Sequence, residues 1–161
     1  DGPACDGSLC AGRCVNHHDA PNVCGTATML GRWCGDANCN APLCRATMYR
    51  AVATQTGRSS AWFRASSVEC SLCTGNLLTR ITLAVPAGVD YDLFVYRPCG
   101  TMIASSIRGA GVADQVELDV PDRTASDDGF DYFIEVRHVS GASCDPFTLT
   151  VEARGADATN C

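Results

Sequence analysis

The chain has 161 residues, of which 46% are hydrophobic and 19% charged, and this composition is sufficient for one folded core. Its formal charge of -6 argues against nucleic acid as a partner, because a protein that binds a phosphate backbone needs a basic patch. No segment reaches the roughly 18 consecutive apolar residues of a membrane helix, so no membrane span is expected. The first residues lack the features of an export signal, and we interpret the sequence as a mature, soluble form.

Cysteine is unusually frequent in this sequence. An even set of twelve favours six disulfides formed in an oxidising compartment, and hence a secreted or cell-surface protein. All twelve basic residues are arginine and none is lysine, which indicates a GC-rich coding sequence and a bacterial source. The cysteines predicted to form disulfides are Cys5, Cys10, Cys14, Cys24, Cys34, Cys39, Cys44, Cys70, Cys73, Cys99, Cys144 and Cys161.

The first part of the chain differs in texture from the rest. Seven cysteines precede residue 46 and lie among Gly, Asn, Asp and Pro rather than among periodic apolar residues. We expect residues 1–45 to form an irregular segment stapled by disulfides, with a short helical turn around Ala27 to Leu30. Because seven is odd, at least one of these cysteines must pair with the later part or with another chain, or remain free.

Residues 46–161 are expected to form a β-sandwich with a short C-terminal tail. Apolar and polar residues alternate there, which is typical of strands with one buried face. In segment 90–96, for example, Tyr91, Leu93 and Val95 should face one way and the even-numbered positions the other. Regular short strands without helical periodicity predict an all-β, jelly-roll-like antiparallel sandwich. The other expected strands are Ile81–Val85, Val116–Val120, Tyr132–Val136 and Phe147–Val151, with weaker candidates at Met48–Ala53 and Trp62–Val68.

Turns and loop cysteines punctuate these strands. Pro86–Gly88 predicts a turn, because Pro presets φ and Gly permits a left-handed conformation. Asp90 and Asp92 are interpreted as residues of a sheet edge or a turn cap. Cys99 follows one expected strand and Cys144 precedes another, which suggests a bridge between these two cysteines.

The run Leu83–Tyr96, with the sequence LAVPAGVDYDLFVY, resembles the bacterial pre-peptidase C-terminal domain. Asp131–Arg137 and Pro146–Val151 resemble the last two strands of that family, so the resemblance covers residues 48–153. It implies a jelly-roll sandwich of the kind appended to secreted proteases and surface proteins. The family implies roles in secretion, calcium binding or binding of matrix-type substrates, without a catalytic centre. This chain differs in having no protease domain and in its cysteine-rich first segment.

No catalytic motif is present in the sequence. Nucleophile elbows, zinc-protease helices, phosphate loops and dinucleotide fingerprints are all missing, and none of His17, His18 and His138 is assigned to catalysis. His138 should be a surface or hydrogen-bonded residue. The Cys70–Cys73 pair fits structural disulfides better than a redox or zinc site, because neither a βαβ context nor a second spaced ligand pair accompanies it. We therefore expect no enzyme activity and no resident cofactor other than calcium.

Carboxylates are concentrated in the second half of the chain. Eight lie between residues 114 and 135, and they form either a solvated acidic face or a calcium site. Calcium takes six to eight oxygen ligands, and a tight loop could offer several through Asp127, Asp128 and Asp131. The spacing is not that of an EF-hand.

Two functions from different classes remain open. The leading hypothesis is a non-enzymatic secreted module that binds an extracellular surface, matrix or glycan. The alternative is a self-assembling structural subunit of a filament, sheath or surface layer. It is motivated by the odd cysteine count before residue 46 and by Cys161, which either anchors the tail to its own body or reaches a neighbouring copy.

Overall fold

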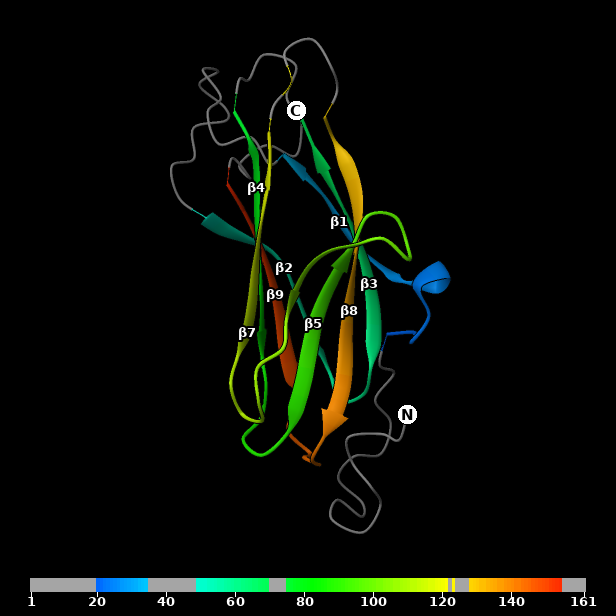
Figure 1. Cartoon of the computed structure of the whole chain (residues 1–161), viewed down its shortest axis with the longest axis vertical. Helices are drawn as coiled ribbons and strands as arrows, with labels where there is room; N and C mark the ends of the chain where they lie inside the picture. Colours follow the sequence, from blue (N-terminus) through cyan, green and yellow to red (C-terminus); the bar gives the residue numbers. More distant parts are fainter. Residues whose placement is uncertain (1–19, 35–48, 70–74, 122, 124–127, 155–161) are drawn as a thin grey trace.

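A computed structural model describes residues 20–34, 49–69, 75–121, 123 and 128–154. Predictions about His17, His18, the Cys70–Cys73 pair and Asp127 lie outside these residues. The described part forms two β-sheets packed face to face, as the separate layers in Figure 1 show. It contains no helix long and apolar enough to cross a membrane. The all-β sandwich expected from the sequence is confirmed.

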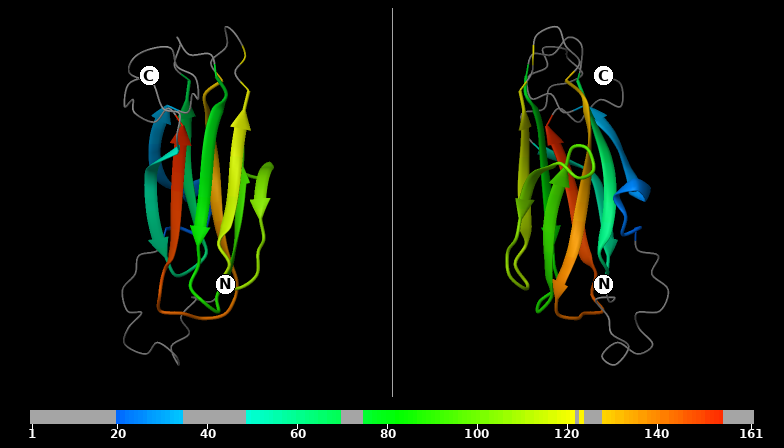
Figure 2. Two further views of the ribbon diagram at one scale, coloured as in Figure 1. Left: turned by 90° about the vertical axis from the view of Figure 1, so that its left-hand side faces the viewer. Right: turned by 45° about the vertical axis from the view of Figure 1, so that its right-hand side comes forward.

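Each sheet draws its strands from distant parts of the chain. The five-stranded sheet consists, in spatial order, of β1 (Thr28–Cys34), β3 (Ala61–Val68), β8 (Phe130–Ser140), β5 (Asp90–Tyr96) and β6 (Met102–Ser106). The four-stranded sheet consists, in spatial order, of β2 (Tyr49–Gly57), β9 (Phe147–Arg154), β4 (Leu77–Ala84) and β7 (Asp114–Val120). Figure 2 shows β9 and β4 at the centre of the four-stranded sheet.

The core lies between the two sheets and follows the alternation of the sequence. In β5, Tyr91, Leu93 and Val95 are each at most 1% exposed, and the even-numbered residues face outward as expected. Burying such side chains contributes roughly 1.5–3 kcal/mol each relative to leaving them in water. Apolar side chains that complete the core from the four-stranded sheet include Leu77, Ile81, Leu83, Val116, Leu118, Phe147, Leu149 and Val151.

Strand β1 corrects the prediction for the first segment. No helical turn forms around Ala27 to Leu30, because a 3₁₀ helix, η1, occupies Cys24–Thr26 and β1 begins at Thr28. β1 pairs with β3 in parallel, whereas the other described strand pairs are antiparallel. A register shift next to Gly31 interrupts the alternation that would have marked this strand in the sequence. Trp33, 6% exposed, joins the common core.

The predicted bridge between Cys99 and Cys144 is wrong. Cys99 is bonded to Cys24, 75 positions earlier in the chain. Cys144 is also disulfide-bonded, but to a cysteine whose side chain is not described. Position relative to a strand end was insufficient to identify the pair, because the turn after β5 folds toward η1 rather than toward the turn before β9.

Candidate functional site

The outer face of the five-stranded sheet carries a cluster of aromatic and charged side chains. These residues occupy alternate positions of β3, β5 and β8, so the pleat that sends apolar neighbours into the core sends them outward. The outer-face cluster consists of Trp62, Phe94, Tyr96, Glu135 and Arg137. Glu135 is only 7% exposed although it faces away from the core, so this face has packing of its own.

The packing over Glu135 comes from the two neighbouring strands. Trp62 lies directly opposite Glu135 in the β3–β8 register, and β5 flanks β8 on the other side. The rings of Trp62 and Tyr96 approach to 5.0 Å between centroids, with an interplanar angle of 31°. Their strands are separated by β8, about 9.5 Å from axis to axis at the usual strand spacing. The two rings therefore meet above β8 and shield the Glu135 carboxylate.

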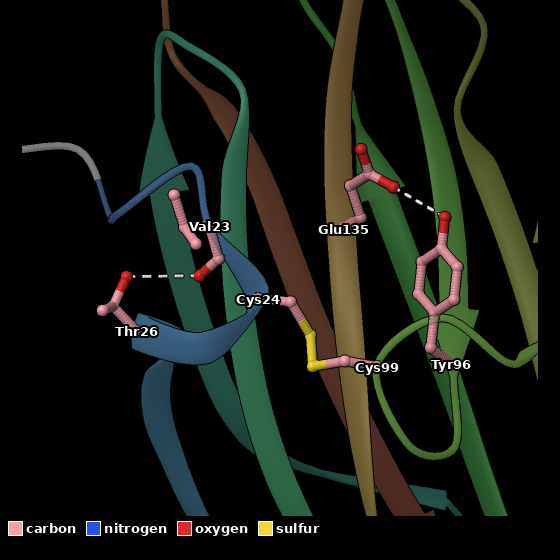
Figure 3. Close-up of a disulfide and its surroundings, with 6 residues drawn as sticks. All are labelled: Val23, Cys24, Thr26, Tyr96, Cys99 and Glu135. Carbon is pink, nitrogen blue, oxygen red and sulfur yellow. Dashed lines mark hydrogen bonds between the residues drawn. A yellow bond between two sulfur atoms is a disulfide. The ribbon is translucent and has the colours of Figure 1, made fainter.

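Glu135 is held by three hydrogen bonds. Tyr96 Oη donates to Glu135 Oε2 at 2.7 Å, as Figure 3 shows. Arg137, two residues further along the same face of β8, donates from Nε to Oε1 at 2.9 Å and from Nη2 to Oε2 at 2.8 Å. Such bidentate, charge-assisted contacts fix the orientation of both side chains. The side chain of Arg137 remains 48% exposed, so this cation is positioned but accessible.

The electrostatics of the cluster follow from these contacts. Burial, followed by the hydrogen bond to the Glu135 carboxylate, raises the pKa of Tyr96, so its hydroxyl stays a donor. The hydrogen bonds to Glu135 raise the pKa of Arg137. Arg137 also lies over the ring of Phe94, with its guanidinium carbon 4.2 Å from the ring centroid. The cluster thus presents aromatic surface and one fixed cation.

The Cys24–Cys99 disulfide borders this cluster. Cys24 belongs to η1, which packs against β3, whereas Cys99 follows β5. Because β8 lies between β3 and β5, the bridge crosses the outer side of β8, as Figure 3 shows. The bridge fixes η1 and the turn after β5 beside the Tyr96–Glu135 pair, and this limits how far either segment can move over the face.

The same outer face continues toward Asp131. Its carboxylate accepts hydrogen bonds from Ser66 on one oxygen and from Arg64 on the other, and the Ser66 and Arg64 contacts lower the pKa of Asp131. Beyond Asp131 lies the end hollow, a depression of about 310 Å³. It is lined by Arg32, Ser66, Ser67, Val68, Gly129, Phe130 and Asp131.

The described residues of the expected calcium site are engaged within the protein. Asp128 Oδ2 accepts from the Arg123 amide, and the Asp128 amide donates to Glu69 Oε2 at 2.7 Å. Asp131 uses both oxygens as described above. Among the residues that the structure describes, no three His, Cys, Asp or Glu side chains are grouped to hold a metal ion. Calcium binding by Asp127, Asp128 and Asp131 stays a prediction, which melting temperatures in chelator and in millimolar calcium would test.

Other residues singled out from the sequence have structural surroundings. His138 Nε2 lies 2.9 Å from the Gly141 carbonyl oxygen, and its ring packs edge-on against Tyr91, which confirms a hydrogen-bonded role. Asp92 pairs with Arg137 of β8, but the pairing of β5 with β6 begins only at Leu93, so the assignment of Asp92 to a sheet edge or a turn cap stays a prediction. Burial, Asp90 and Asp114 raise the pKa of Asp92.

The sequence analysis did not identify the outer-face cluster. One signal was available: Glu135 is a charged residue with apolar residues on both sides, Ile134 and Val136, in a strand whose alternate positions are buried. The aromatic residues at 94 and 96, on the expected outer side of β5, were a second signal. Neither signal shows that Trp62, distant in the sequence, completes the group.

No family model and no curated protein matches this chain. Among solved structures it is similar to the pre-peptidase C-terminal domain of a collagenase from Bacillus anthracis, at 7% identity and a TM-score of 0.42, over 86% of this chain and 98% of that one. It is also similar to a chain of the infectious bursal disease virus Gx strain structure, at 14% identity and a TM-score of 0.22, over 72% of this chain and 35% of that one. The pre-peptidase C-terminal domain is also the family that residues 48–153 resemble in sequence.

Proposed function

We propose that this chain is a non-enzymatic secreted module that binds a glycan of an extracellular surface or matrix through the outer-face cluster. The observation that supports it is the partly buried ring pair of Trp62 and Tyr96 beside the fixed cation of Arg137. Trp, Tyr and Arg are the side chains most enriched at the centres of binding surfaces. A sugar ring offers an apolar face for stacking on such rings and hydroxyl groups that can hydrogen-bond to the cation at their side.

The cluster is ready to bind without large rearrangement. Its side chains are placed on three adjacent strands of one sheet and are locked by mutual hydrogen bonds and ring contacts. Binding therefore costs little side-chain entropy, which favours recognition of a weakly interacting polymer. Glu135 already accepts three hydrogen bonds, so it supports the proposal as an anchor for Arg137 and Tyr96 rather than as a general base.

The test is binding to a panel of soluble polysaccharides, measured by affinity electrophoresis and by calorimetry with oligosaccharides of the sugar that retards the protein. Trp62→Ala should weaken binding at least tenfold, because stacking surface at the centre of the face is lost. Tyr49→Ala is the matched control. Tyr49 lies under the guanidinium groups of Arg80 and Arg154 on the four-stranded sheet. The Tyr49→Ala substitution therefore removes an aromatic ring that contacts cations, but from the other sheet.

Circular dichroism must show that both variants fold. If the wild-type protein binds a glycan and Trp62→Ala binds it with the same affinity, the glycan binds at another surface. Absence of binding across neutral, acidic and amino-sugar polymers would reject the proposal.

A specific observation also favours the second candidate, a self-assembling structural subunit. β6 is an edge strand, and among the described strands it pairs only with β5. Met102 and Ile103 on β6, together with Ile107 and Val112 in the connection to β7, are 43–70% exposed. β6 contains no charged residue and no proline. Natural edge strands use such residues to avoid pairing with other chains. We propose a second copy of this chain as the partner of this edge.

A further inference from the structure

Four buried polar atoms at one end of the sandwich have no hydrogen-bond partner among the residues that the structure describes. They are the indole nitrogen of Trp33 and the hydroxyl oxygens of Ser67, Thr79 and Tyr132. Their residues are 6%, 1%, 1% and 0% exposed, respectively, so bulk solvent does not reach them. Leaving a buried hydroxyl or N–H group unpaired costs roughly 1–3 kcal/mol, and four together are uncommon in a well-packed interior.

The four groups, here called the interior polar cluster, come from four strands and both sheets. Trp33 of β1 lies beside Ser67 of β3 in the parallel register. Tyr132 of β8 lies opposite Ala65, so it is one inward-facing position from Ser67 along the neighbouring strand. The rings of Trp33 and Tyr132 contact each other edge-on at 6.3 Å between centroids.

Thr79 approaches the same point from β4 in the opposite sheet. Burial raises the pKa of Tyr132, and hydrogen-bond contacts with the Thr79 hydroxyl and the Trp33 indole lower it in part, so both groups lie close to the Tyr132 hydroxyl. Neither contact has the distance and angle of a full hydrogen bond, because all three atoms are without a partner by those criteria. The three groups therefore lie near one another without pairing well directly.

We propose that the interior polar cluster is a binding site for one internal water molecule, which joins the two sheets. The chemistry of the groups fits one bridging oxygen, because the Trp33 N–H can only donate, whereas the hydroxyls of Thr79 and Tyr132 can donate or accept. A buried water commonly makes about three hydrogen bonds to groups that lack other partners. Ser67 supplies a fourth partner within the cluster.

Ser67 places this site next to the end hollow. It belongs to the interior polar cluster and also lines that depression, so the cluster borders the hollow. The site also has a structural consequence for β1. Trp33 is the core residue of this edge strand, and a water bound to its indole would tie β1 to β8 and β4 as well as to its neighbour β3.

Conservative substitutions test the proposal, because it predicts whether each one lowers or raises the melting temperature. If a water bridges the cluster, Tyr132→Phe and Thr79→Val each remove one of its partners and lower the melting temperature by about 3 °C. The melting temperature of the double variant should fall by less than the sum of the two single decreases, because the first substitution already weakens the water bridge. Thr82→Val removes an outward-facing hydroxyl from the same strand as Thr79, one that makes only an exposed 3.4 Å hydrogen bond to Gln115, so it should change the melting temperature much less.

A dry cluster gives the opposite result. Removing an unpaired buried hydroxyl would relieve its desolvation, so an unchanged or raised melting temperature in Tyr132→Phe would overturn the proposal. A second readout does not depend on stability. In nuclear magnetic resonance, the indole N–H proton of Trp33 should show a cross-relaxation signal at the water frequency, and its absence would also overturn the proposal.

Discussion

The Tyr96 hydroxyl donates a 2.7 Å hydrogen bond to the Glu135 carboxylate across two neighbouring strands, on the side of the sheet that faces away from the core. The bond links an aromatic ring to an ion pair, because the same carboxylate also accepts from Arg137. A feature of this kind has two effects. It stabilises the outer side of the five-stranded sheet, and it fixes the positions of side chains through which we propose that the protein binds its ligand.

The Tyr96→Phe variant should destabilise the fold by about 1–2 kcal/mol, because the lost hydrogen bond has a charged acceptor. Tyr49→Phe is its control, since the ring of Tyr49 contacts Arg80 and Arg154 whether or not the hydroxyl is present. Chemical denaturation without reductant gives both values. Equal stability of Tyr96→Phe and wild type would show that the outer bond contributes nothing.

The Gly141→Ala variant should destabilise the fold by about 2–4 kcal/mol, the range typical of a severe packing defect. The backbone at Gly141 has a φ of +83°, and a Cβ there would lie 2.1 Å from the Gly88 carbonyl oxygen. Gly88→Ala separates strain from collision, because its φ is +76° but a Cβ has nothing within 4 Å. It should cost only about 1 kcal/mol. Similar unfolding midpoints for the two variants would contradict the close approach of the two turns.

These turns also show what the sequence could provide. The turn at Pro86–Gly88 and the inward-facing residues of β5 were predictable, because turn chemistry and alternation are local properties. Strand β1 was not predicted, since Gly31 breaks its alternation and its pairing with β3 depends on residues about 35 positions away. Strand β6 was not predicted either, because its side chains are mostly exposed and leave no periodic pattern.

The candidate site was less accessible to sequence reasoning than the fold. Acidic residues at 127–131 attracted attention because they are adjacent in the chain, yet the described ones are engaged with Arg64, Ser66 and backbone amides. The outer-face cluster joins residues as distant as Trp62 and Arg137. Only the strand order β3-β8-β5 brings them together.

Two aspartates should affect stability in opposite directions as pH changes. The pKa of Asp131 is lowered, so its stabilisation is present above the pKa of the unfolded chain and is lost as pH falls through the folded value. The pKa of Asp92 is raised, so its charged form costs stability at neutral pH, and this cost disappears as pH falls through its folded pKa. At pH 7, Asp131→Asn should therefore lower the melting temperature and Asp92→Asn should raise it.

Both effects should stay within about 1 kcal/mol, because solvent screens surface charges. Each difference from wild type should shrink as pH falls below the folded pKa of the carboxylate concerned, and the Asp92 difference should shrink at the higher pH because its pKa is raised. A difference that stays unchanged over the whole acidic range would assign the effect to packing rather than to charge.

The disulfides should carry a large share of the stability. Replacing both Cys24 and Cys99 by Ser removes a link between positions 75 residues apart and should cost about 2–4 kcal/mol under oxidising conditions. Thiol titration of the denatured, unreduced wild-type protein should give close to zero free thiols. Four or more free thiols would contradict a set of structural disulfides, and an unchanged unfolding midpoint in the double variant would contradict the role of this bridge.

The geometry of β6 restricts the kind of assembly it can support. If two copies pair antiparallel along β6, the same strand faces itself, and the contact is a closed two-fold dimer. A filament needs a second, different edge, such as β1 or β2 at the far ends of the two sheets. A dimer that does not grow would therefore indicate β6–β6 pairing, whereas growth would indicate that β6 meets another edge.

Ile103→Lys tests this edge, because a charge on an exposed position of β6 would have to be desolvated beside a second copy. It should shift the protein to monomer in light scattering coupled to size-exclusion chromatography, while the fold remains intact. Val139→Lys is the control, since Val139 is also exposed but lies on β8, away from the β6 edge.

Electrophoresis without reductant distinguishes this non-covalent contact from a covalent one. A ladder of bands that collapses to monomer on reduction would indicate intermolecular disulfides, and Cys161 would be the first cysteine to replace. A wild-type protein that remains a monodisperse monomer at high concentration, with no repeats in negative-stain micrographs, would exclude assembly through β6 and leave ligand binding at the outer face as the function to pursue.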